Sequence, residues 1–193
     1  MTTDVEIVNA GLIKLGEATI TTLADDVKAA RLASAIFADQ RDVVLRAHPW
    51  NFALVRAELT AHVTPPLWGF ANAYDLPGDP NYCLRVISVE GEADVGRGAW
   101  QIEARQIVTD LASPIRILYL RRVSDYALWD ALALDALAAR VAMELAEPLG
   151  KSTSLHNAMA RLYDNTLRAA RSADGQEGTA RMLAADGWIE ARI

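Results

Sequence analysis

Histidine and cysteine, the side chains best suited to bind a transition metal, are few and widely separated in this sequence. His48, His62 and His156 lie far apart, and no two of them have the i, i+4 spacing that places two imidazoles on one helix face. Cys83 is the only cysteine, which excludes a disulfide framework and a metal site built from cysteines. We therefore expect neither a bound metal nor a cofactor.

Sequence patterns for phosphate binding and nucleophilic catalysis are also missing. The stretch Gly96-Arg97-Gly98 lacks the further glycine, the lysine and the helix start of a phosphate-binding loop, so it predicts a turn. Ser152 and Ser154 precede His156 closely, but no acid is placed to orient the imidazole, and helix capping explains both serines. The sequence contains no Gly-x-Ser-x-Gly motif.

Carboxylates are the remaining candidates for acid–base catalysis. Four pairs lie close together in the sequence: Asp25/Asp26, Asp39/Asp42, Glu92/Asp94 and Glu144/Glu147. Asp42 precedes Arg46 by four residues on a predicted helix, which is typical of an exposed ion pair. No pair stands out as the acid and base of a glycoside hydrolase. Hydrolysis of a cell wall or another polysaccharide stays open as one candidate function, the alternative to a non-enzymatic one. Its catalysis would require a carboxylate such as Glu92 or Glu144.

The composition indicates an acidic chain with ample apolar material for a core. Its formal net charge is −6 and 52% of its residues are hydrophobic. Acidic residues outnumber basic ones in each of the segments 1–50, 51–123, 124–173 and 174–193. This balance argues against another candidate function, that of a regulatory DNA-binding protein. The longest uncharged stretch, 59–74, contains two prolines and is shorter than the ~20 residues of a membrane helix. We expect no membrane segment, no signal peptide and synthesis inside the cell.

Two helices are expected before residue 50. Thr3 and Glu6 have the spacing of a capping box, and Gly16 is a natural end for the helix that follows. A longer helix over 26–47 is expected to begin at Asp25 or Asp26 and to end before Pro49.

The middle of the chain favours short strands broken by proline and glycine. The strand-forming runs are 52–59, 84–89, 100–108 and 115–120. We expect them to form one small antiparallel sheet.

Two further helices are expected after the strands. Ser124 is expected to cap the third, which ends at Pro148 and carries two apolar stripes. We expect one stripe to pack inside the bundle and the other against a neighbouring subunit. Ser152 or Thr153 caps the fourth, which extends to 173.

The chain end, 174–193, is expected to be a linker followed by an apolar arm. We expect an end this apolar to pack either on its own domain or on another chain. In the second case it supplies the candidate contacts with a portal or a neighbouring subunit: Arg181, Leu183, Trp188, Ile189 and Ile193.

The expected fold is α+β and mainly helical. Residues 1–49 and 124–173 form a four-helix bundle, with two helices from each end of the chain, and 50–123 form an inserted β domain. His48, Pro49, Trp50 and Phe52 form a structural corner between the second helix and the first strand, where the aromatic rings wedge into the helix–sheet junction. His48 is expected to hydrogen-bond to carbonyls freed at the helix end.

Several segments, in this order, resemble the tail tubular protein A family, the head-to-tail adaptors of short-tailed phages. They are 9–16 (NAGLIKLG) with 20–23 (ITTL), 43–53 (VVLRAHPWNFA), 144–149 (ELAEPL) with 151–152 (KS), and 170–178 (ARSADGQEG). Together they cover most of the helical part, whereas the β insert matches mainly in pattern.

The resemblance implies a ring, usually of twelve copies, at the head–tail junction of a virion. The ring joins the portal protein to the tail nozzle or another tail protein, and the genome DNA passes through it without sequence-specific binding. The resemblance implies no catalytic residues, and it implies synthesis in the cytoplasm of a host bacterium. An acidic chain suits a channel that must not grip phosphates.

Overall fold

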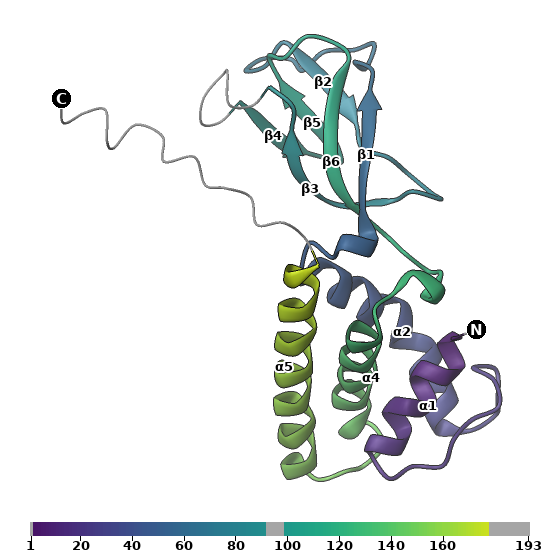
Figure 1. Cartoon of the computed structure of the whole chain (residues 1–193). Coiled ribbons are helices and arrows are strands. Elements are labelled where there is room, and N and C mark those ends of the chain that lie inside the picture. The colour runs from purple at the N-terminus through teal and green to yellow at the C-terminus, as the bar shows by residue number, and fades with distance from the viewer. Residues whose placement is uncertain (1, 92–98, 178–193) are drawn as a thin grey trace.

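The computed structural model describes residues 2–91 and 99–177 of the chain. A helical region and a β region are stacked end to end, and the chain runs from helices through strands and back to helices (Figure 1). The described residues contain four α-helices and two small antiparallel sheets, which confirms the α+β class.

The first helix, α1 (Asp4–Lys14), begins and ends as the sequence predicts. The backbone N–H of Glu6 donates to the Thr3 hydroxyl at 3.2 Å, and the N–H of Thr3 donates to the Glu6 carboxylate at 3.0 Å. Gly16 has a φ of +68°, the left-handed conformation that glycine adopts readily after a helix. The capping box and the glycine stop are therefore confirmed.

The second helix, α2 (Lys28–Arg46), begins without a side-chain cap, so the predicted cap from Asp25 or Asp26 is wrong. The Asp25 carboxylate instead accepts the backbone N–H groups of Thr21 and Thr22 at 2.7 and 3.1 Å. These hydrogen bonds lower the pKa of Asp25. Asp26 forms an ion pair with Arg31. Both acids therefore stabilise structure around the start of the helix without capping it.

Two three-stranded sheets form the β region, where a single sheet was predicted. The first has the order β1-β6-β3 and the second the order β2-β5-β4, and all pairs are antiparallel. The strands are β1 (Leu54–Leu59), β2 (Asn72–Asp75), β3 (Cys83–Val89), β4 (Trp100–Glu103), β5 (Gln106–Thr109) and β6 (Ile115–Arg121).

Two local features explain why the sheet prediction was wrong. The expected strand over 100–108 is a hairpin, because Ala104 and Arg105 have φ values of 42° and 66° and reverse the chain. The strand β2 was missed altogether. It is only four residues long and lies next to a proline-containing stretch.

The two sheets pack face to face around a shared core. Tyr74 and Ile107 from the second sheet and Ile117 and Tyr119 from the first are buried in one cluster. Because side chains alternate along a strand, the residues between them face outward, on opposite sides of the sandwich. Each sheet therefore has an outer face that its partner sheet does not cover.

The third helix, α4 (Ala131–Ala146), begins seven residues after Ser124, so the predicted start is wrong. A short 3-10 helix, η2 (Tyr126–Leu128), precedes it, with Asp125 as its cap. Asp130 caps α4 by accepting the N–H of Leu132 at 2.8 Å. The chain is therefore divided into two capped segments where one helix was expected.

The helix α4 lies between the other helices. It packs against α1, α2 and the long helix α5 (Thr153–Gln176), as Figure 1 shows. Buried residues on its several sides include Ala136, Leu137, Val141 and Leu145. Its apolar stripes are thus covered largely within the chain, which corrects the expectation that one of them faces a neighbouring subunit.

Gly11 lets α1 approach α4 closely. A Cβ at this position would lie 3.0 Å from the carbonyl oxygen of Ala138 and 3.3 Å from the backbone nitrogen of Ala142. We expect Gly11→Ala to lower the free energy of unfolding by about 1–2 kcal/mol in urea denaturation. Overpacking a helix contact costs about 1–3 kcal/mol, which exceeds the gain of up to ~1 kcal/mol in helix propensity.

Gly175→Ala is the matched control, since Gly175 also lies in a helix but has nothing within 4 Å of a Cβ. This variant should be as stable as the wild type or slightly more stable. Equal stabilities of the two variants would contradict the close approach at Gly11.

Polar contacts attach the β region to the helices. Arg46 of α2 donates to the carbonyl of Leu84 in β3, and Arg122 pairs with Asp42 of α2 at 2.6 Å. The ring of Tyr82 lies under the Arg122 guanidinium, whose carbon is 4.2 Å from the ring centroid. These contacts fix the orientation in which the helical region presents the sandwich.

Candidate functional site

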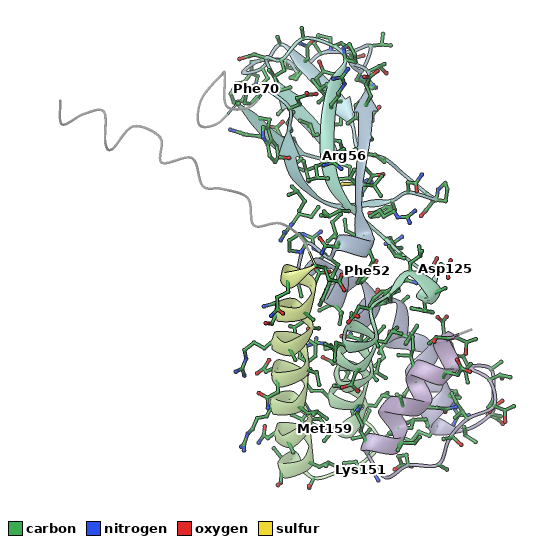
Figure 2. All side chains as sticks on the ribbon, viewed as in Figure 1. Phe52, Arg56, Phe70, Asp125, Lys151 and Met159 are labelled. Atoms are coloured by element: carbon green, nitrogen blue, oxygen red, sulfur yellow. The ribbon has the colours of Figure 1, made fainter. Side chains whose placement is uncertain are left out.

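The predicted corner is a tightly packed junction between α2, β1 and the C-terminal end of α5. Figure 2 shows Phe52 close to that end of α5. Trp50 is fully buried, and its indole N–H donates to the carbonyl of Val44 at 3.0 Å. The rings of Phe52 and Trp129 extend the aromatic cluster, with a centroid distance of 5.1 Å. Trp50 and Phe52 therefore pack in the junction between α2 and β1.

Asp174 of α5 holds this corner in place. One carboxylate oxygen lies 3.0 Å from His48 Nε2, and the other accepts the backbone N–H of Asn51 at 2.9 Å. The Asn51 side chain donates to the main-chain carbonyl of Asp174 at 2.7 Å. Asp174 is only 6% exposed, so this carboxylate is buried together with its partners.

These contacts correct two expectations from the sequence. His48 binds Asp174, while Arg171 donates to the freed carbonyl of Ala47 at 2.6 Å. The linker does not begin at 174, because α5 continues through Gln176. Asp174 was missed as a site residue, although it lies within the segment 170–178 that carries the resemblance.

The segment 9–16 also stabilises local structure. The Asn9 side chain donates to the carbonyl of Ile20 at 2.9 Å and accepts the N–H of Ile20 at 2.8 Å. Lys151, from the segment that follows α4, pairs with Glu17 at 2.6 Å. Side chains in these segments therefore form contacts between helices and the loops that follow them.

Two of the candidate catalytic carboxylates in the described part of the chain, Glu144 and Asp42, form ion pairs. Glu144 pairs with Arg140 at 2.8 Å, and Asp42 pairs with Arg41 and Arg122, not with Arg46 as predicted. Glu92 and Asp94 lie outside the described residues.

The histidine and serine that resembled a nucleophile pair connect or cap helices. His156 hydrogen-bonds through Nδ1 to the carbonyl of Met143 at 3.1 Å, and Ser152 caps α5 as predicted. Within residues 2–91 and 99–177, no three histidine, cysteine or acidic side chains are grouped as metal ligands. Over the same ranges, no helix has the length and apolar character to span a membrane.

Cys83 is poorly placed for thiol chemistry. It is 2% exposed, and burial raises the pKa of its thiol. The reactive thiolate is therefore suppressed at neutral pH.

An exposed apolar loop is the feature that the sequence analysis missed. The segment 62–70 connects β1 to β2, and its side chains Val63, Leu67 and Trp68 are 96%, 99% and 87% exposed. Phe70, at one end of this loop, lies in the part of the β region far from the helices (Figure 2). The sequence signal for this loop is the uncharged stretch 59–74, which is too short for a membrane helix and gives no sign of its exposure.

A shallow hollow of about 530 Å³ lies on the outer face of the other sheet, β1-β6-β3. Arg56, Ser88 and Leu118 line it, together with Glu58 and the segments around Glu90 and Arg116. Arg116 donates to Glu58 at 3.2 Å and to Glu90 at 3.3 Å. Among the described residues, Arg56 forms no ion pair.

Comparisons of the sequence with protein-family models and with curated proteins gave no match. The resemblance to the adaptor family therefore rests on the segments quoted above and on the places where they lie. The candidate arm contacts, Arg181, Leu183, Trp188, Ile189 and Ile193, lie outside the described residues.

Proposed function

We propose that the protein is a structural head-to-tail adaptor subunit. In this proposal it forms a homo-oligomeric ring, of twelve copies by the resemblance, beneath the portal protein of a phage or phage-like particle. The ring joins the portal to the tail nozzle or another tail protein and surrounds the channel through which the DNA passes. Its helices form a bundle that carries the β insert.

One observation carries the proposal. Two of the segments that resemble the adaptor family, 43–53 and 170–178, contact each other through the hydrogen bonds of Asp174 with His48 and Asn51. Residues more than 120 positions apart thus form one junction, on which the orientation of the β region depends. We interpret these residues as structural: they occur together because they hold the helical and β regions in one orientation. This interpretation requires no catalytic function for them.

Two further features support a role in assembly. The β region carries an exposed apolar loop of the kind that marks interaction surfaces. The net charge of −6 favours release of DNA, since carboxylates repel the phosphates that Lys and Arg would bind. We propose that the protein has no enzymatic activity.

Binding to the portal can be tested by size-exclusion chromatography of the chain mixed with purified cognate portal rings. We expect the two proteins to elute together. A chain that ends at residue 177 should keep its unfolding midpoint but bind less well, because it lacks the apolar arm. Separate elution of the full chain and the portal at every ratio would contradict the adaptor function.

A further inference from the structure

The terminal turn of α5, residues 173–177, ends at the junction of the two regions and leads directly into 178–193 (Figure 1). Its composition is poor for a helix end. Gly175 lies inside the helix, and glycine is a weak helix former because it gives up the most backbone freedom. Asp174 and Glu177 place negative charge where the helix dipole favours positive charge, and the last turn contains no basic residue. Local interactions therefore favour this turn only weakly.

Contacts with the corner hold the terminal turn instead. The Asp174 carboxylate accepts the backbone N–H of Asn51 at 2.9 Å and lies 3.0 Å from His48 Nε2. The Asn51 side chain donates to the main-chain carbonyl of Asp174 at 2.7 Å, one of the last carbonyls of the helix, which lack a regular intrahelical partner. A Cβ at Gly175 would meet nothing within 4 Å, so close packing does not require glycine there. The turn thus depends on hydrogen bonds to residues far away in the sequence.

The part of α5 before the turn is held independently of these contacts. Tyr163, Leu167 and Ala170 are buried in the core of the helical region. The Arg171 side chain donates to the carbonyl of Ala47 at 2.6 Å. Loss of the contacts made by Asp174 and Asn51 is therefore expected to unwind the terminal turn and to stop there.

We infer that the terminal turn of α5 is a releasable latch between the corner and the chain end. The closed latch holds Asn51, just before β1, and keeps the start of 178–193 at the junction. In the open latch the backbone rise changes from ~1.5 to ~3.3 Å per residue, so the chain end reaches about 9 Å further.

A partner that binds 178–193 and draws the chain outward favours the open latch, because only the open state supplies the extra length. By linkage, opening the latch also loosens the contacts beside β1, so binding at the chain end and the position of the β region are coupled. This use of the latch rests on the proposed function, in which the chain end contacts the portal.

NMR of the isolated full chain tests whether the corner holds the turn. Asn51→Ala with Asp174→Ala removes the corner contacts of the terminal turn. We expect this double variant to shift the latch toward the open state by roughly tenfold or more, seen as loss of the helical Cα chemical shifts of 173–177. The shifts of 160–170 should stay helical. Asp174→Ala alone should give a smaller loss, because the Asn51 side chain keeps its contact with the carbonyl of residue 174.

Gly175→Ala supplies the matched control. It leaves the corner contacts in place and favours the local helix by roughly fivefold in equilibrium constant. Added to the double variant, it should restore part of the helical shifts of 173–177, which a general collapse of the corner would not allow. Asp164→Ala, which removes an exposed carboxylate from the same helix, should leave these shifts unchanged. If the double variant fails to fold, Asp174→Ala with and without Gly175→Ala gives the same comparison at smaller amplitude.

Hydrogen exchange followed by mass spectrometry tests release on assembly. In the full chain bound to cognate portal rings, peptides covering 173–177 should exchange at least roughly threefold faster than in the free chain, whereas those covering 160–170 should not.

Two outcomes would overturn the inference. Helical shifts of 173–177 that survive in the double variant would exclude the latch, and unchanged or slower exchange of 173–177 in the complex would exclude its release by the portal. Absence of any complex would contradict the proposed function and release by the portal with it, while the latch itself is judged on the isolated chain.

Discussion

Replacing Trp50 by alanine is expected to lower the free energy of unfolding by about 3–5 kcal/mol, the range for deleting a large buried aromatic side chain. Trp50 is fully buried and donates a hydrogen bond to the Val44 carbonyl. Its ring stacks on Phe52 with a centroid distance of 5.7 Å. Its cluster also includes Leu84 and Leu120 of the β region, so the cavity would open at the junction of the two regions.

Urea denaturation followed by circular dichroism measures this loss. Trp68→Ala is the matched control, because Trp68 is 87% exposed and its loss should change stability by no more than about 0.5 kcal/mol. Trp50→Phe should fall between the two, since it keeps an aromatic ring but loses the indole donor. Similar losses for the two alanine variants would contradict the buried junction.

Asp174→Ala is expected to lower the free energy of unfolding by about 1–3 kcal/mol, the cost of leaving buried polar groups unpaired. The change removes the acceptors of the Asn51 N–H and of His48 while α5 keeps its other contacts. The main-chain carbonyl of residue 174 and the Arg171 side chain keep their contacts with the corner, so the end of α5 is held less tightly but not released. The expected result is a lower urea midpoint with the helical content preserved.

Two controls separate the Asp174 contacts from a general effect of lost charge. Asp174→Asn keeps an oxygen that can accept the Asn51 N–H, so it should recover part of the loss. Asp164→Ala removes an exposed carboxylate from the same helix and should have little effect. If Asp164→Ala were as damaging as Asp174→Ala, the corner would not depend on the buried carboxylate.

Local sequence signals predicted most of the helical region. The Thr3 and Glu6 pair and the Ser152 cap act between residues that are three apart, so their geometry follows from the spacing alone. The strands were harder, because a hairpin turn at Ala104 and Arg105 requires positive φ without a glycine to signal it. The pairing into two sheets depends on contacts between distant strands, which spacing does not show.

The sequence predicted only the part of the corner that lies in residues 48–52. His48, Pro49, Trp50 and Phe52 were correctly placed at the end of a helix, but the partner of His48 lies 126 positions further along the chain. The glycine and polar residues around Asp174 favoured a linker, whereas its contacts with the corner keep the helix intact. Tertiary hydrogen bonds override weak local propensity in this way.

The apolar loop shows a different limit of sequence reasoning. Leu67 and Trp68 resemble core residues by type, and only the structure shows that they point into solvent. Conversely, the apolar surplus of α4 suggested an interface, but most of it is buried within the chain. Within the described residues, the loop in the β region is therefore a better candidate interaction surface than α4.

Electron microscopy of the chain mixed with its cognate portal tests the central claim most directly. The account predicts a closed ring of this protein bound to one face of the portal, with an open channel along the common axis. A reconstruction that shows the portal alone, with this protein remaining unassembled at saturating concentration, would contradict its role as a head-to-tail adaptor.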